Sequence, residues 1–219
     1  MVAVHRVVAD PRPGLSALAE LVDDPANLDE LIALRNLSDP LARAAAAAIA
    51  LVPVANRYQG PHAAVVMAPF LWLGPSRFSP GTFGVLYAAR SRETAVRESG
   101  YHAAKILGAS HSPPTTVPRV ALSMDLDEHG IADCRRATGI DPAVYDPNDY
   151  AVSQRFGRDA RAAGRSGVEY DSVRHVHGVC FGIFRPASIA GVSDHAENIE
   201  LAWDGATIAS YAVVTTYVL

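Results

Sequence analysis

An arginine in a loop rich in glycine and proline is the first residue of this sequence that could bind a ligand. Arg77 lies in the stretch LGPSRFSPGTFG, residues 73–84. A planar guanidinium group matches the oxygens of a phosphate or diphosphate, and a glycine-flanked loop lets the backbone approach the same group. The alternative is a surface arginine paired with an acidic side chain. Arg57 is a second candidate for the same kind of contact.

Glu98 is the candidate for an acidic group at a reacting centre. It lies beside Val96 in a segment that we expect to be an amphipathic helix. Ordinary glycoside hydrolysis needs two carboxylates, because one must protonate the leaving group. One carboxylate is enough when the leaving group is cationic and departs neutral. The plainer interpretation of Glu98 is a solvated helix charge. Glu93 is the competing acid, and its position favours a charge in the first turn of the helix.

Two tyrosines and a serine could complete a binding site. Tyr58 and Tyr87 could stack on an aromatic ring of a ligand, although Tyr87 ends an apolar segment and could equally belong to the core. Ser172 follows the segment GVEYD and could donate a hydrogen bond to an amide or a ribose hydroxyl. It could equally cap a turn.

Two further groups of residues have both a functional and a structural interpretation. His175 and His177 are expected on one face of a strand and could bind a metal ion, but no third ligand is evident. We therefore predict no metal. Four arginines form a stripe along a predicted helix, namely Arg155, Arg158, Arg161 and Arg165. The first interpretation is a solvated helix face, and the alternative is a contact surface for an acidic segment of a partner.

Familiar motifs for nucleotide and ester chemistry are absent from the sequence. There is no GxGxxG after a strand, no GxxxxGK[ST], no GxSxG and no HExxH. Residues 164–167, GRSG, have the wrong spacing for a nucleophile elbow. A Rossmann dinucleotide site, a P-loop and a serine hydrolase are thereby disfavoured.

Composition indicates a folded protein. Of the 219 residues 49% are hydrophobic and 19% charged, and the formal net charge is −4, whereas nucleic-acid-binding proteins are usually basic. The two cysteines, Cys134 and Cys180, form neither a disulfide framework nor a zinc quartet. The first residues, MVAVHRVVADPRPG, lack the features of a signal peptide, and no apolar stretch reaches the ~20 residues that span a bilayer. We expect a cytoplasmic protein that contacts neither membrane nor nucleic acid.

The elements that must position these residues change in character near residue 56. Before it, Val7 and Val8 could end a short strand, and three helical signals follow, at residues 15–22, 28–35 and 40–52. We predict a helical N-terminal extension over residues 1–55, followed by one domain over residues 56–219.

The second part mixes strands and helices without strict alternation, which favours an α+β fold. Strands are expected at residues 65–68, 84–88, 117–126, 178–184 and 208–218. Helices are expected at residues 94–107, with Ser91 as a plausible cap, and at residues 148–163, ending before Gly164. Residues 127–147 are expected to form a long loop.

The order of short motifs over residues 57–186 resembles the RES domain family. That family reads approximately G-R-[WF]-[NS]-x-x-G, then L-Y-[TA]-[SA], A-[LV]-x-E, S-Q, G-x-x-G-[IV]-x-Y-x-S-[VI]-R and F-R-P. The corresponding segments here are SRF at 76–78, LYAA at 86–89, AVRE at 95–98, SQ at 153–154, GVEYDSVR at 167–174 and FRP at 184–186. Each piece is weak alone, but their order and spacing make chance matches improbable. Ser76 departs from the pattern, which usually has glycine there.

The resemblance implies an ADP-ribosyltransferase-like fold, a split β-sheet with a cleft for NAD+. RES proteins consume NAD+, and they are usually the toxin of a bacterial toxin–antitoxin pair whose antitoxin is a small helical protein that blocks the cleft. Carried onto this sequence, the resemblance makes Glu98, Arg77 and Ser172 the catalytic candidates. It makes NAD+ the substrate, with Arg57, Tyr58, Arg77, Tyr87 and Ser172 as its binding candidates.

We therefore expect an NAD+-consuming toxin with a cognate antitoxin partner. ADP-ribose transfer to a host enzyme is favoured over NAD+ hydrolysis or phosphorolysis, which would kill by depleting NAD+. Two rivals remain from other classes. One is a metal-dependent hydrolase that uses His175 and His177, and the other is a non-catalytic binding module on a degenerate RES fold, for which Ser76 is the one suggestive departure.

Overall fold

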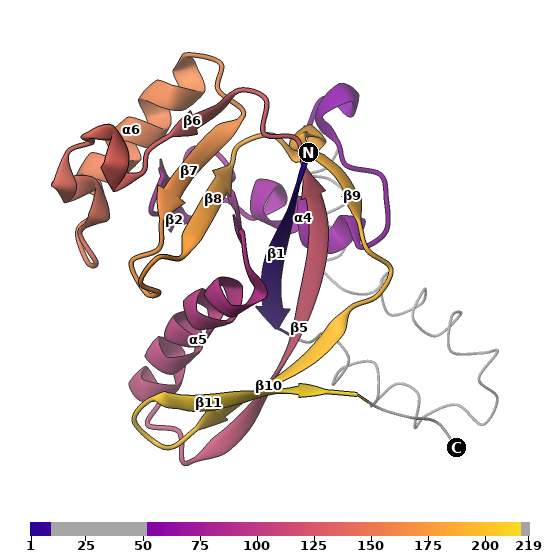
Figure 1. Cartoon of the computed structure of the whole chain (residues 1–219), viewed down its shortest axis with the longest axis vertical. Coiled ribbons are helices and arrows are strands. Elements are labelled where there is room, and N and C mark those ends of the chain that lie inside the picture. The colour runs from indigo at the N-terminus through magenta and orange to yellow at the C-terminus, as the bar shows by residue number, and fades with distance from the viewer. Residues whose placement is uncertain (10–51, 216–219) are drawn as a thin grey trace.

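The computed structural model describes residues 1–9 and 52–215, and these form a mixed α+β fold around one large sheet (Figure 1). The α+β class predicted from the sequence is confirmed. The three helical signals predicted over residues 15–52 lie, apart from Val52, outside the described residues.

The sheet follows the strand order β11-β10-β5-β1-β4-β8-β7-β6, with β9 paired to β5. Its strands are β1 (Val2–Ala9), β4 (Leu86–Ala89), β5 (Thr115–Leu126), β6 (Ile131–Asp133), β7 (Gly167–Asp171), β8 (Val179–Ile183), β9 (Ile189–Val192), β10 (Glu197–Trp203) and β11 (Ile208–Val214). A separate two-stranded sheet joins β2 (Pro75–Ser76) and β3 (Ser79–Pro80). All pairs in the large sheet are antiparallel except β6 with β7.

The large sheet is divided between β1 and β4. These two strands share a single residue pair, His5 with Ala89, whereas β1 pairs with β5 from Val2 to Ala9. Two half-sheets therefore diverge on either side of this junction. Figure 1 shows β10 and β11 at one end of the molecule, and α6 with β6 and β7 at the other. The split sheet expected from the resemblance is present.

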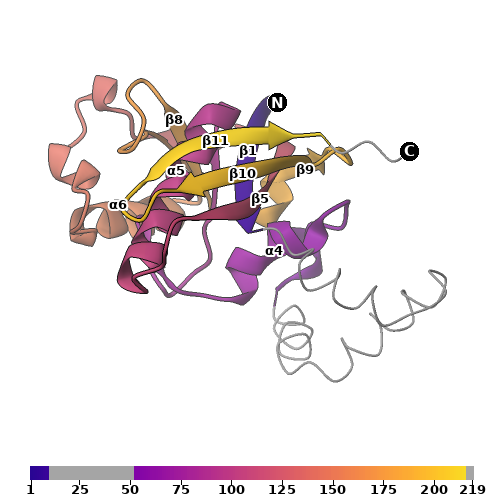
Figure 2. The same cartoon turned by 90° about the horizontal axis from the view of Figure 1, so that it is seen from below.

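Three α-helices lie among the described residues, namely α4 (Ala63–Leu71), α5 (Arg92–Ala109) and α6 (Ala151–Ala162). Short 3-10 turns are η2 (Val54–Asn56), η3 (Arg136–Thr138), η4 (Pro142–Tyr145) and η5 (Pro186–Ser188). In Figure 2, β11, β10 and β5 lie side by side, and α4 lies on the side of β5 opposite to β10.

Successive side chains of β5 pack alternately in two apolar layers, one on each face of the sheet. Val120, Leu122 and Met124 pack in the cluster that contains Val66 of α4, whereas Ala121 packs in the cluster that contains Val96 of α5. Successive strand side chains point to opposite faces, so α4 and α5 cover different faces of this half-sheet. Helix α5 also contacts β1, β4 and β8, and it therefore bridges the junction between the half-sheets.

Most predicted elements are confirmed. Ser91 caps α5 as expected, because its side chain accepts a hydrogen bond from the Thr94 amide. Gly164 follows α6 with a φ of 78°, the left-handed conformation that glycine adopts readily after a helix. The strands predicted at 84–88, 117–126 and 178–184 correspond to β4, β5 and β8, and the one predicted at 208–218 corresponds to β11 over the described residues.

Three structural predictions were wrong. Residues 65–68 belong to helix α4, because a short apolar run fits a buried strand and a buried helix equally well. Residues 127–147 contain β6, η3 and η4 in place of a simple long loop. Strand β1 lies in the middle of the sheet, so the boundary predicted at residue 55 does not separate Val2–Ala9 from the domain.

No helix among the described residues is long and apolar enough to cross a membrane.

Candidate active site

A cavity of about 390 Å³ lies where the two half-sheets diverge. Strands β1 and β4, helix α5 and the Arg77 loop contribute its walls, together with residues near the start of α6 and the end of β7. Its charged lining consists of one carboxylate and three arginines, which are Glu98, Arg6, Arg77 and Arg174. The predicted pair of Glu98 and Arg77 is thus brought into one cavity.

Glu98 is oriented by Ser172. The Ser172 hydroxyl donates a hydrogen bond of 2.5 Å to Glu98 Oε1, although 74 residues separate the two along the chain. The same hydroxyl oxygen accepts hydrogen bonds from the backbone amides of Arg174 and His175, at 3.0 Å and 2.9 Å. The Ser172 hydroxyl therefore caps the turn, as one of its two predicted roles expects, and also contacts Glu98.

The thiol of Cys180 also faces the Glu98 carboxylate, with Sγ 3.8 Å from Oε1. Burial in the core raises the pKa of this thiol, so it stays protonated and can donate. Both the hydroxyl and the thiol contact Oε1, and among the described residues no cation forms an ion pair with Glu98. An unpaired carboxylate facing a cavity is suited to stabilising positive charge on a bound molecule.

Glu93, the competing acid, occupies a different setting. It lies one turn earlier on α5 and pairs with Arg97 at 2.8 Å on the exposed face of the helix. The hydrogen bond from Arg97 lowers the pKa of the Glu93 carboxyl. The predicted first-turn surface role is confirmed.

Arg77 is held by backbone carbonyls. Its Nη1 donates to the carbonyl oxygens of Val144 and Asp146, at 2.9 Å and 3.1 Å, and its guanidinium carbon lies 4.6 Å from the centre of the Tyr150 ring. Within residues 1–9 and 52–215, no carboxylate forms an ion pair with Arg77, so its Nε and Nη2 groups can meet an anionic ligand.

The loop that carries Arg77 is attached to the start of α6. The Ser153 hydroxyl donates to the carbonyl of Arg77 at 2.6 Å, and the Gln154 amide donates to the carbonyl of Ser76 at 3.0 Å. One turn further on, a Cβ added to Gly157 would lie 2.0 Å from the Phe78 carbonyl oxygen. The SQ motif therefore fastens the arginine loop, and the glycine permits that close approach.

Tyr87 supports the same loop from β4. Its hydroxyl accepts from the Phe78 amide at 3.0 Å and donates to Ser76 Oγ at 2.9 Å. Burial raises the pKa of this phenol to about 12, so it remains a neutral donor. The serine that departs from the family pattern thus has a hydrogen-bonding role here, which speaks against degeneration at this position.

Arg6 is a lining residue that the sequence did not point to. It lies on β1 and its Nη1 donates to the Tyr87 carbonyl at 2.7 Å, while its Nε is buried and has no hydrogen-bond partner among the described residues. Burial lowers the pKa of its guanidinium to about 10, which leaves it cationic at neutral pH. An arginine in the middle of the apolar segment VAVHRVVA was the available signal.

Four further residues line the cavity and were not predicted as site residues from the sequence, namely Tyr101, His102, Tyr150 and Arg174. Arg174 belongs to the GVEYDSVR motif, and its guanidinium carbon lies 3.5 Å from the centre of the Tyr101 ring. Its Nη2 donates to the Pro147 carbonyl at 3.2 Å.

Arg57 and Tyr58 are not brought into this cavity. Arg57 Nε donates to the carbonyl of Val52 at 2.8 Å, and the Tyr58 ring packs in the apolar cluster that contains Val66 and Met67. Neither lines the cavity that holds Glu98. The structure therefore gives no support to a ligand contact by either residue at this cavity.

The histidine pair does not lie on a strand. Both His175 and His177 fall in the turn between β7 and β8, where His177 has a φ of 63°. The Nδ1 atom of His175 lies 2.9 Å from Thr94 Oγ1, and Nε2 lies 3.6 Å from Glu93 Oε1. The described part of the chain contains no cluster of three His, Cys, Asp or Glu side chains that could hold a metal ion.

The predicted arginine stripe is exposed on and just beyond α6, as the solvated interpretation expects. Only Arg161 of the four has a ring contact, with its guanidinium carbon 4.9 Å from the centre of the Phe83 ring, among the residues that the structure describes.

Comparison with solved structures finds a partial likeness to a chain in the crystal structure of the M. tuberculosis MbcT-MbcA toxin-antitoxin complex. The match has 16% sequence identity and a TM-score of 0.41, and it covers 60% of this chain and 73% of that chain. No curated protein matches the sequence.

The model of the RES domain family matches residues 51–204. That range includes Arg77, Tyr87, Glu98 and Ser172, and it extends over well more than half of the 219 residues. The chain belongs to the RES domain family.

Proposed function

We propose that this protein binds NAD+ in the cavity at the sheet junction and cleaves the bond between nicotinamide and ribose. The observation that carries the proposal is the charge of the lining, which contains one carboxylate and three arginines. NAD+ carries two negative charges on its diphosphate and one positive charge on its nicotinamide ring, which is the complementary pattern. Opposite charges brought together in a partly enclosed cavity attract more strongly than in bulk water.

The chemistry fits a single carboxylate. The bond from C1′ of the ribose to the ring nitrogen breaks, and both bonding electrons leave with nicotinamide, which becomes neutral. Positive charge then develops on the ribose, and the Glu98 carboxylate stabilises it, with Ser172 fixing the orientation of that carboxylate. No second carboxylate lines the cavity among the described residues, which disfavours ordinary acid-assisted glycoside hydrolysis.

Arg77 and Arg6 are the proposed diphosphate ligands. Each has guanidinium N–H groups without a hydrogen-bond partner among the described residues, and both side chains line the cavity that contains Glu98. Tyr87 and Tyr150 offer ring surface in the same lining, where an aromatic ring of the substrate could stack.

The acceptor of the ADP-ribosyl group is proposed to be a side chain of a host protein, and release to water or to phosphate is the alternative. Whichever nucleophile attacks C1′ loses a proton in the step. Membership of the RES domain family supports a toxin of a type II toxin–antitoxin pair, because RES proteins are usually such toxins. We accordingly propose a cognate antitoxin that covers the cavity.

The test incubates the protein with NAD+ labelled in the adenylate phosphate, together with bacterial lysate. A labelled protein band indicates transfer, free ADP-ribose indicates hydrolysis, and ADP-ribose-1″-phosphate indicates phosphorolysis. Glu98→Gln should abolish all three products. Glu93→Gln is the matched control on the same helix and should leave them unchanged, since Glu93 pairs with Arg97 on the exposed face. Loss of product in both variants, or in neither, would count against the role of Glu98.

A further inference from the structure

Arg77 depends for its position on a segment that lies outside the family motifs. Both hydrogen bonds from its Nη1 end on backbone carbonyls, those of Val144 and Asp146. These residues lie at the end of η4 and directly after it. Any movement of that segment would move the two acceptors and, with them, the guanidinium group.

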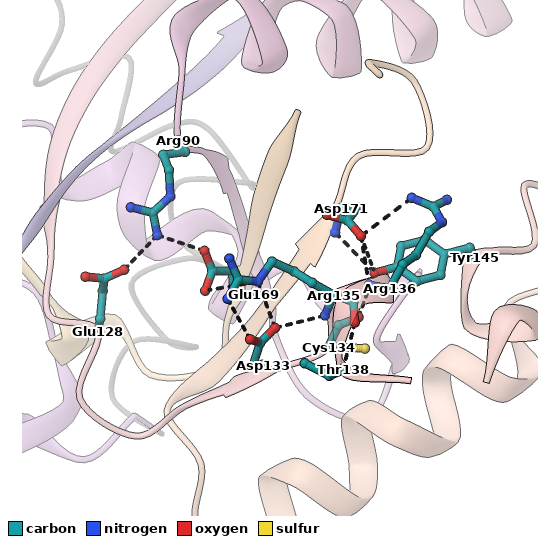
Figure 3. Close-up of polar contacts among 10 residues, drawn as sticks. All are labelled: Arg90, Glu128, Asp133, Cys134, Arg135, Arg136, Thr138, Tyr145, Glu169 and Asp171. Carbon is teal, nitrogen blue, oxygen red and sulfur yellow. Dashed lines mark hydrogen bonds and ion pairs between the residues drawn. The ribbon is translucent and has the colours of Figure 1, made fainter. Parts of the chain in front are cut away.

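The segment is anchored by Tyr145, which lies between the two acceptors. Its side chain is buried, and the hydroxyl donates to the Cys134 carbonyl at 2.6 Å and accepts from the Asp171 amide at 3.2 Å (Figure 3). Burial raises the pKa of the phenol to about 12, so it donates throughout the neutral range. Figure 3 also shows Arg136 against the Tyr145 ring, with its guanidinium carbon 3.8 Å from the ring centre.

The other end of this anchor is the strand that carries the serine of the site. Asp171 ends β7, and the next residue is Ser172, which holds Glu98. The Asp171 carboxylate in turn accepts a hydrogen bond from the Arg136 amide at 2.8 Å. The Tyr145 hydroxyl therefore joins the segment that holds Arg77 to the strand that holds Ser172.

We propose that Tyr145 is a positioning residue that fixes the Arg77 guanidinium relative to Glu98 by anchoring the Val144 and Asp146 carbonyls to β7. The inference rests on the proposed function in one respect, which is that Arg77 binds the diphosphate of NAD+. Tyr145 itself does not line the cavity. Its removal should weaken substrate binding and leave the bond-breaking step at Glu98 intact.

The same polar network contains a matched control. Figure 3 shows a second branch in which Glu169 of β7 accepts a hydrogen bond from Arg90 at 2.8 Å, while Arg135 pairs with Asp133 at 2.6 Å. This branch contacts β7, but its ion pairs do not involve the segment that holds Arg77. Glu169→Gln therefore weakens the network without touching the proposed anchor.

The experiment compares wild-type protein, Tyr145→Phe and Glu169→Gln in steady-state NAD+ cleavage. We expect Tyr145→Phe to raise KM for NAD+ about tenfold with kcat within about twofold of wild type, since uniform binding is lost. Glu169→Gln should leave both constants unchanged. A Tyr145→Phe enzyme with unchanged KM, or with kcat lowered at constant KM, would overturn the proposal.

A second readout is independent of catalysis. The side-chain Nε–Hε signal of Arg77 can be assigned in ¹⁵N-labelled protein by its loss in Arg77→Lys. Tyr145→Phe should shift or broaden this signal, whereas Glu169→Gln should not. If the wild-type protein cleaves no NAD+, the proposed function fails, and this signal still decides whether Tyr145 fixes Arg77. An Arg77 signal identical in wild type and Tyr145→Phe would refute the anchoring role.

Should Tyr145→Phe fail to fold, Arg136→Ala provides a milder change, because it removes the exposed cation over the ring and its 3.7 Å ion pair with Asp171 but leaves the Tyr145 hydroxyl in place. A KM rise of about threefold and a smaller shift of the Arg77 signal are then expected. An unchanged KM together with an unchanged signal would contradict the proposal.

Discussion

The Ser172 hydroxyl caps a turn and also contacts the proposed catalytic carboxylate. It caps the turn after β7 through two backbone amides, and it donates its only proton to Glu98. In Ser172→Ala, the Glu98 carboxylate loses its strongest orienting contact, and we expect kcat for NAD+ cleavage to fall about 100-fold, the loss typical of a misplaced catalytic group. The free energy of unfolding should also fall by about 1–3 kcal/mol, because two backbone amides lose their acceptor.

Ser166→Ala separates these two effects. Ser166 is also buried, and its hydroxyl donates to the His129 carbonyl at 2.7 Å, away from the cavity. Its loss should cost a similar stability and leave kcat unchanged, as measured by chemical denaturation and by the NAD+ assay. Equal activity losses in the two serine variants would mean that Ser172 acts only through folding.

Sequence spacing predicted which residues of the motifs would line one candidate site. Glu98, Arg77 and Ser172 stand in ordered motifs, and the structure brings all three together. Arg6 could not be predicted in this way, because β1 is far from the motifs in sequence. It lines the cavity only because β1 pairs with β4 and β5 in the folded sheet. Arg57 was predicted as a phosphate contact and Tyr58 as a stacking residue, but the structure packs both outside the lining of this cavity.

Helix α6 positions the arginine loop through its first turns, and Gly157 permits the contact. In Gly157→Ala the added Cβ would meet the Phe78 carbonyl oxygen at 2.0 Å, so helix and loop must separate. Alanine favours a helix interior over glycine by about 1 kcal/mol, but the clash opposes this gain. We expect kcat/KM for NAD+ to fall at least about tenfold, because the displaced loop carries Arg77.

Gly108→Ala in α5 is the corresponding control. The nearest atom to its added Cβ is in the Trp203 ring at 3.9 Å, an ordinary contact distance. This variant should keep full activity and gain up to about 1 kcal/mol of stability. Activity that survives Gly157→Ala would show that α6 does not control the loop.

Acid stability is expected to depend on the short edge strand β6. The hydrogen bonds from Arg135 lower the pKa of the Asp133 carboxyl below its ordinary value. A carboxyl with a lowered folded-state pKa stabilises the fold above about pH 4 and loses that contribution as the pH falls further. Asp133→Asn should therefore lower the thermal midpoint at pH 7, with the difference from wild type shrinking below about pH 4. A difference that is independent of pH would contradict this assignment.

Elements were predictable where one local signal dominated. The Ser91 cap and helical spacing define α5, and alternation of apolar residues defines β5. Helix α4 was missed because the apolar run VVMA carries no period, and β7 was missed because three of its five residues, Gly167, Val168 and Tyr170, become buried only through packing between β6 and β8. The Tyr145 anchor could not be predicted either, since its contacts join residues 134, 145 and 171 only in the folded chain.

The cavity lies at the junction of the two half-sheets, where β1 and β4 share a single residue pair. A ligand held by Arg6 on one half-sheet and by Arg77 beside the other should join the two halves. NAD+ at 100 times its Kd would add about 2.7 kcal/mol to the free energy of unfolding. For a protein of this size the thermal midpoint should then rise by about 5–10 °C.

This shift is best measured in Glu98→Gln, which should bind NAD+ without consuming it. Calorimetry with and without NAD+ gives the difference. Arg77→Ala in the same background should reduce it strongly, because the proposed diphosphate ligand is removed. An equal NAD+-induced rise in both proteins would place the ligand elsewhere.

Release of nicotinamide from NAD+ by purified protein, followed by chromatography, tests the proposed cleavage directly when wild type and Glu98→Gln are compared at equal concentration. We predict steady release by wild type and a loss of about 100- to 1,000-fold in Glu98→Gln, as expected when the group that stabilises the developing charge is removed. Glu93→Gln should match wild type. Undiminished nicotinamide release by Glu98→Gln would contradict the assignment of Glu98 as the catalytic carboxylate.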